Sequence, residues 1–135
     1  MGLAERRAVK AFQDNVLPGI QQKVDQLVGK PVPMEVDWDK LADEGYGEHY
    51  ESYWTQGGFT PLTQALEEIA VDDMGREALK DGLKSIRVKG EYAHALQADF
   101  SSGVLTIDFK FWNPVGADEQ KDFKNRIVKT LEAGL

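Results

Sequence analysis

Residues 105–111, Leu-Thr-Ile-Asp-Phe-Lys-Phe, show the clearest structural pattern in this chain of 135 residues. Every second residue is apolar, and the residues between them are threonine, aspartate and lysine. A period of two predicts a β-strand with one buried face and one polar face. The preceding Ser101-Ser102-Gly103 is typical of a hairpin turn, so we expect residues 91–100 to form the partner strand.

Two further strands are predicted outside this hairpin. Ile86 and Val88 alternate with basic residues, and every second residue from Val32 to Trp38 is apolar. Pro33 has no backbone N–H to donate to a ladder. Either the strand at residues 32–38 therefore lies at a sheet edge, or Pro33 lies at the start of that strand.

The N-terminal third follows helical spacing. Apolar residues recur in steps of three or four from Val9 to Leu27, which predicts a helix over residues 3–28. Pro18-Gly19 should kink this helix or divide it into two nearly collinear ones. Gly29 is expected to end it as a C-terminal cap.

Four more helical segments are predicted. Gly57-Gly58 is expected to close a short helical segment, after which Thr60-Pro61 begins a new helix. Asp72 or Asp73 should cap the next helix, which Gly82 ends. A last helix is expected after Gly116, because apolar residues recur with helical spacing and acidic residues occupy its first turn.

These elements predict the fold class. The order is helix, strand, short helices, three strands, helix, and strands joined by short turns are expected to pair antiparallel. The length suits one domain. We predict one α+β domain over residues 1–135, a two-layer sandwich. Its N- and C-terminal helices cover one face of a mostly antiparallel sheet of about four strands.

Negative charge is concentrated in residues 37–77. This stretch has two basic and eleven acidic residues, so its formal charge is 2 − 11 = −9, whereas the whole chain carries −7 and the remainder sums to +2. Its first half, residues 37–59, is also rich in tyrosine and tryptophan. An acidic surface accelerates encounter with a cationic partner, and aromatic side chains are enriched at binding hot spots.

This combination predicts a binding function. We expect a non-catalytic module that engages a basic protein partner through segment 37–59. The candidate binding residues are Trp38, Asp43, Glu44, Tyr46, Glu48, His49, Tyr50, Glu51, Tyr53 and Trp54. Immunity proteins and secretion chaperones are comparable in size and charge, and the analogy goes no further.

Two alternatives remain open. The first is a small-molecule-binding protein or enzyme with a pocket between sheet and helices, walled by Trp38, Tyr50 and Trp54 with His49 at its mouth. A histidine beside a carboxylate can act as general acid or base. The second alternative is a homodimer formed through the edge strand at residues 32–38.

Several reaction classes lack the residues they need. The chain has no cysteine and no Gly-rich phosphate loop or Gly-x-Ser-x-Gly motif. A partial calcium-loop pattern starting at Asp37 has Leu41 and Ala42 where an oxygen ligand and a glycine are required. Glu91 and His94 have a di-metal ligand spacing, but only once and in a predicted strand. We therefore expect no catalytic residue, metal or cofactor.

The charge balance and the apolar content of the sequence bear on where in the cell the protein is expected. The acidic balance argues against nucleic-acid binding, because phosphates require paired cations. No apolar run approaches the roughly 18 residues that span a bilayer. The first ten residues mix apolar and charged side chains, unlike a signal peptide. We expect a cytoplasmic protein without membrane contact.

Overall fold

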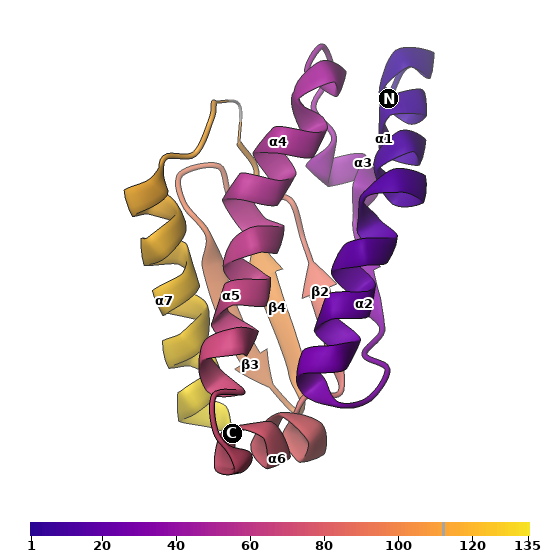
Figure 1. Cartoon of the computed structure of the whole chain (residues 1–135). Coiled ribbons are helices and arrows are strands. Elements are labelled where there is room, and N and C mark those ends of the chain that lie inside the picture. Colours follow the sequence, from indigo (N-terminus) through magenta and orange to yellow (C-terminus); the bar gives the residue numbers. More distant parts are fainter. Residues whose placement is uncertain (112) are drawn as a thin grey trace.

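The structure is a computed structural model that describes residues 1–111 and 113–135 (Figure 1). Its helical elements are α1 (Leu3–Asn15), α2 (Leu17–Val28), α3 (Trp38–Leu41), η1 (Gly47–His49), α4 (Tyr50–Trp54), η2 (Thr55–Phe59), α5 (Thr60–Ile69), α6 (Asp73–Gly82) and α7 (Ala117–Gly134). Its strands are β1 (Met34–Val36), β2 (Ser85–Val88), β3 (Gln97–Ser101) and β4 (Val104–Asp108).

The four strands form one open sheet in the order β1-β2-β4-β3. β1 pairs parallel with β2, and β2 pairs parallel with β4. Only β3 and β4 pair antiparallel, as the two arms of the predicted hairpin. The α+β class and the number of strands agree with the prediction. The prediction of a mostly antiparallel sheet is wrong, because the sheet is mixed and mostly parallel.

Two connections explain this difference. Residues 37–84 join β1 to β2 through several helices, and a connection of that length allows parallel pairing. Residues 89–96 join β2 to β3, but these two strands are not neighbours. The chain passes to the far side of β4 before it returns, so β4 lies beside β2 in the same direction. A short connection implies antiparallel pairing only when the two joined strands become neighbours.

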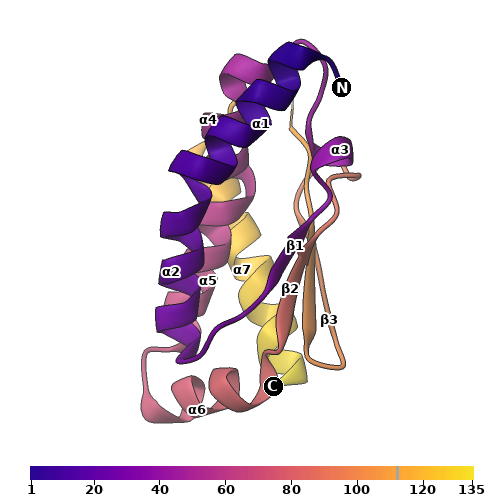
Figure 2. The ribbon, with the colours of Figure 1, turned by 90° about the vertical axis from the view of Figure 1, so that its right-hand side faces the viewer.

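The two faces of the sheet differ in chemistry. Ile86, Val88, Leu105 and Ile107 are almost completely buried, and Figure 2 shows α1, α2, α5 and α7 on one side of the sheet. The alternate residues form a polar row across the other face. In strand order this row is Glu35, Arg87, Thr106 and Asp99.

Several helix ends lie where the sequence predicts them. α1 and α2 are separate helices that meet at Val16, and Gly29 ends α2 with φ of 86°. Asp72 caps α6 by accepting a hydrogen bond of 2.8 Å from the N–H of Gly75. β1 is an edge strand that Pro33 immediately precedes. A homodimer through this edge stays a prediction.

The helix around Gly57 and Gly58 differs from the prediction. α4, η2 and α5 follow one another without a break, so the two glycines do not close a segment and Thr60 is not an N-cap. η2 is a wide turn in which the N–H of Thr60 donates to the carbonyl of Thr55, five residues earlier. An ordinary α-helix would bring the ring of Pro61 against the carbonyl of Gly57. A π-type turn is one way for a helix to absorb this conflict.

Two strand boundaries also differ. Residues 91–96 form a loop before β3, and Trp38 begins α3 after Asp37 rather than ending a strand. The cap is Asp37, whose carboxylate accepts from the N–H of Lys40 at 3.2 Å. Asp residues favour this local hydrogen bond over extended structure. The strand pattern therefore continues in the sequence beyond the point where the strand itself ends.

Candidate functional site

Most aromatic side chains of segment 37–59 belong to the core. Tyr50, Tyr53 and Trp54 are only 2%, 7% and 2% exposed, and Trp38 is half-buried. The rings of Tyr50 and Trp54 stack with their centroids 4.3 Å apart. Tyr46, at 36%, is the one tyrosine of the segment that is exposed. The buried rings stabilise the fold and leave Tyr46 as the aromatic residue available to a partner.

The aromatic residues predicted to wall the pocket of the small-molecule alternative pack against one another and against Phe12. The ring of Phe12 lies 5.9 Å from that of Trp38 and 5.1 Å from that of Trp54, and the two tryptophan rings are 5.6 Å apart. The ring of His49 stacks on Tyr53 at 4.9 Å. Aromatic packing thus occupies the space between helices and sheet here.

The carboxylates of the segment divide into two groups. Asp43 is half-buried and pairs with Lys110 at 2.9 Å. Glu44, Glu48 and Glu51 are exposed. Among residues 1–111 and 113–135, none of these three forms an ion pair with a lysine or arginine; Glu48 has only the Nε2 atom of His49, at 3.3 Å. Their negative charge is therefore open to solvent. We call these three residues the acidic turn.

Three depressions adjoin the acidic turn at Glu48, which belongs to the lining of all three. One of about 240 Å³ lies between α1 and α4 and also includes Glu51. A second, of about 340 Å³, continues along α4. The third, of about 370 Å³, lies between the start of α1 and residues 45–48. Two of the three residues of the acidic turn, Glu48 and Glu51, therefore border concave surface.

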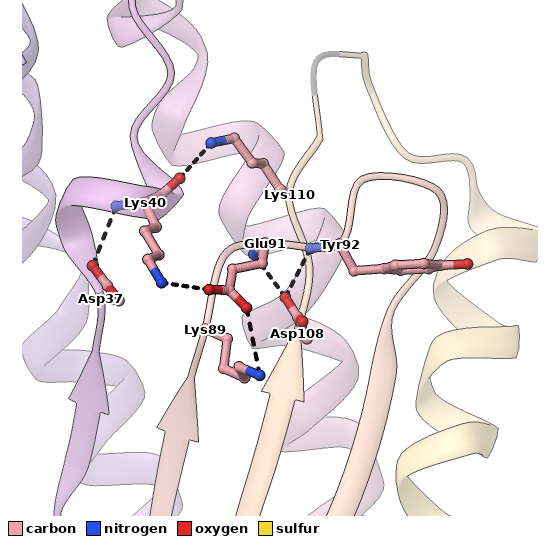
Figure 3. Close-up of polar contacts among 7 residues, drawn as sticks. All are labelled: Asp37, Lys40, Lys89, Glu91, Tyr92, Asp108 and Lys110. Carbon is pink, nitrogen blue, oxygen red and sulfur yellow. Dashed lines mark hydrogen bonds and ion pairs between the residues drawn. The ribbon is translucent and has the colours of Figure 1, made fainter.

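A separate polar cluster lies at the carboxyl ends of the parallel strands (Figure 3). Lys40 of α3 pairs with Glu91, which also lies 3.4 Å from Lys89. One carboxylate oxygen of Asp108, at the end of β4, accepts from the N–H groups of Glu91 and Tyr92 at 2.7 and 2.9 Å. These contacts tie the loop after β2 to α3 and β4.

Lys110 extends the cluster to the candidate segment. Its Nζ atom donates to the carbonyl of Lys40 and pairs with Asp43 (Figure 3 shows the first contact). Hydrogen bonding with Glu91 and the negative charge of that carboxylate raise the pKa of Lys40. The same hydrogen bond, with the charges of Lys40 and Lys89, lowers the pKa of Glu91. The cluster holds the beginning of segment 37–59 against the sheet.

Ligands of open α/β sheets bind at this type of strand end. A depression of about 620 Å³ adjoins the cluster, and its lining includes Asp39 and Arg87. Its charged groups include Lys40, Lys89 and Glu91, and both lysines already lie within ion-pair distance of Glu91. The cluster therefore accounts for local structure, whereas the acidic turn has no lysine or arginine partner among the described residues.

Tyr50 of segment 37–59 lies close enough to Glu5 of α1 for the charge of Glu5 to affect its pKa. Its hydroxyl donates to the carbonyl of Asp43 at 2.6 Å. Burial first, and then the negative charges of Glu5 and Asp43, raise the pKa of Tyr50 to about 12. Tyr50 is thus a buried, protonated phenol beside two carboxylates.

The raised pKa of Tyr50 predicts alkaline destabilisation. In the unfolded chain Tyr50 loses its proton near its ordinary pKa of 10.0, but in the folded chain near 12. The resulting stabilisation is complete below pH 10 and is lost as the pH rises toward 12. Urea unfolding at several alkaline pH values should show a steeper fall for the wild type than for Tyr50→Phe. Parallel curves would contradict the assignment.

Several residues around the acidic turn were not identified from the sequence. Glu5 and Ala8 come from α1, and Lys110 follows β4. Glu5 accepts from Gly45, Ala8 lies beside Gly47 and Lys110 pairs with Asp43, so each is far in the sequence from its neighbour. Nothing in the local pattern of these residues indicates the contact, because helical and strand periods describe only near neighbours.

Comparison with protein-family models, with curated proteins and with solved structures found no match for this chain. Residues 1–111 and 113–135 contain no group of three or more histidine, aspartate or glutamate side chains placed to hold a metal ion. Within the same residues, no helix has both the length and the apolar character required to traverse a bilayer.

Proposed function

We propose that the chain is a non-catalytic binding module that engages a basic protein partner through segment 37–59. The observation that carries this proposal is the acidic turn, where Glu44, Glu48 and Glu51 are exposed without a lysine or arginine partner among the described residues. Glu48 lines three depressions, and Glu51 lines two of them. Unpaired exposed charges attract an oppositely charged surface and accelerate its encounter.

We assign the contact with the partner to the acidic turn rather than to all of residues 37–77. Elsewhere in that stretch, Glu67 pairs with Lys23 at 2.6 Å and Glu68 pairs with Lys124 at 2.9 Å. Asp73 pairs with Arg76. These carboxylates already have cationic neighbours and contribute less to an external field.

Charge reversal tests the proposal. The triple variant Glu44→Lys, Glu48→Lys, Glu51→Lys should lose protein partners that the immobilised wild type retains from a host lysate at about 0.01 M salt, where screening is weak. The same partners should be released at about 1 M salt. With a purified partner, calorimetry should show binding weakened by at least roughly tenfold.

The control places the same charge change elsewhere. Glu77, Asp81 and Glu132 are exposed acidic residues on α6 and α7. α6 lies at the opposite end of the molecule from α4 (Figure 1). Reversing these three should leave binding within about twofold. Equal loss in both triple variants, or binding that does not respond to salt, would refute the proposal.

A further inference from the structure

Glu5 is a buried carboxylate without a cationic partner. It lies in the first turn of α1 and is only 8% exposed. Its Oε1 atom accepts one hydrogen bond of 3.3 Å, from the N–H of Gly45. Among the described residues, no lysine, arginine or histidine lies within ion-pair distance of it. The N–H of Gly45 and the N-terminal end of α1 stabilise this carboxylate in part, and a cationic group would stabilise it further.

The same carboxylate lines a cavity. The depression of about 370 Å³ between α1 and residues 45–48 has walls of Ala4, Ala8, Gly45 and Gly47, with Glu5 and Glu48 as its charged groups. The space beside Gly45 is open, since no described atom lies within 4 Å of the position its Cβ would occupy. Gly47 packs closely against Ala8, because a methyl group on Gly47 would lie 3.2 Å from the Cβ atom of Ala8.

The charged groups that line this depression, Glu5 and Glu48, are both carboxylates. Glu5 and Asp43 both contribute to the raised pKa of Tyr50, after burial. The exposed carboxylate of Glu48 adds negative charge at the cavity. Arg6 follows Glu5 directly in α1, and adjacent helical residues do not face each other. Arg6 is exposed, whereas Glu5 is buried.

We propose that this cavity receives a lysine or arginine side chain of the protein partner. The cationic group would pair with Glu5 and Glu48, while its aliphatic stem would pack on Ala4 and Ala8. Small apolar walls beside two carboxylates match the two parts of such a side chain. The inference rests on the proposed function and names the position within the binding surface where one partner residue inserts.

A synthetic hexalysine peptide is the probe. Titration into the isotopically labelled wild-type chain at about 0.01 M salt should shift the amide resonances of Gly45 and Gly47. Glu5→Gln should weaken peptide binding roughly tenfold, because it removes a charge-assisted pair. The glutamine can still accept from Gly45, so the fold is expected to persist. Glu77→Gln, with the same charge change on α6, should bind within about twofold of the wild type.

A second variant fills the cavity without changing charge. Ala4→Leu should weaken hexalysine binding while Glu5 is retained, because the larger side chain occupies the space of the lysine stem. If Glu5→Gln and Ala4→Leu both bind like the wild type and Gly45 does not shift, the cavity assignment is wrong. The proposed function survives that result if reversal of the acidic turn still weakens binding. If neither set of variants affects binding, both proposals fail.

Discussion

Trp54→Ala should lower the free energy of unfolding by about 3–5 kcal/mol, the range for removing a large aromatic side chain from a core. Trp54 is 2% exposed and contacts the rings of Tyr50, Phe12 and Trp38. The substitution removes the centre of this group and leaves a cavity that its neighbours can fill only in part. Urea unfolding followed by circular dichroism measures the change.

Tyr46→Ala is the matched comparison from the same segment. Tyr46 is exposed, so its loss should change stability by less than about 1 kcal/mol. A small effect at Trp54 would show that this part of the segment is not packed as described. A large effect at Tyr46 would show that its ring has a structural contact.

Gly58→Ala should also destabilise the chain, by about 3 kcal/mol or more, which is the upper part of the range for overpacking a core. A Cβ atom on Gly58 would lie 2.1 Å from two ring atoms of Phe109, which is 0% exposed. The helix cannot move away freely, because Gly57 makes a similarly close approach to Phe111. Thermal and urea unfolding both report the loss.

Two controls separate crowding from a general effect of glycine replacement. Gly19 lies within α2, and nothing lies within 4 Å of the position that its Cβ would occupy. Gly19→Ala should therefore stabilise the chain by roughly 0.5–1 kcal/mol. In the double variant Gly58→Ala, Phe109→Leu, part of the loss should be recovered relative to additivity, since the smaller side chain relieves the contact. Strictly additive effects would contradict direct crowding between these residues.

These glycines explain an error of sequence interpretation. Gly57-Gly58 followed by Thr60-Pro61 is typical of one helix ending and another beginning. In the structure the helix continues, because its glycines allow the backbone to approach Phe109 and Phe111. A glycine pair permits a break and a close contact equally well. Only the residues that lie opposite decide between them, and they are about 50 positions away in the sequence.

The candidate site likewise has one part that the sequence indicates and another that only the structure shows. The concentration of carboxylates in residues 37–59 is visible in the sequence, and Glu44, Glu48 and Glu51 are exposed as a binding role requires. For the tyrosines and tryptophans, the sequence does not show whether the side chains face the core or the solvent. Short helical segments can turn the same rings toward the core or toward solvent. Packing against Phe12 of α1 places Trp54 inside.

The sequence alone indicated most local elements: an interruption of the N-terminal helix near Pro18-Gly19, the hairpin of β3 and β4, the cap at Gly29, and a cap at Asp72 or Asp73. These depend on interactions between residues that are close in the chain. The strand order and the parallel pairing of β1, β2 and β4 were decided only by the tertiary structure. The tertiary structure also decided the hydrogen bond from the N–H of Gly45 to the carboxylate of Glu5. Such contacts depend on how distant segments pack, and periodicity carries no information about that.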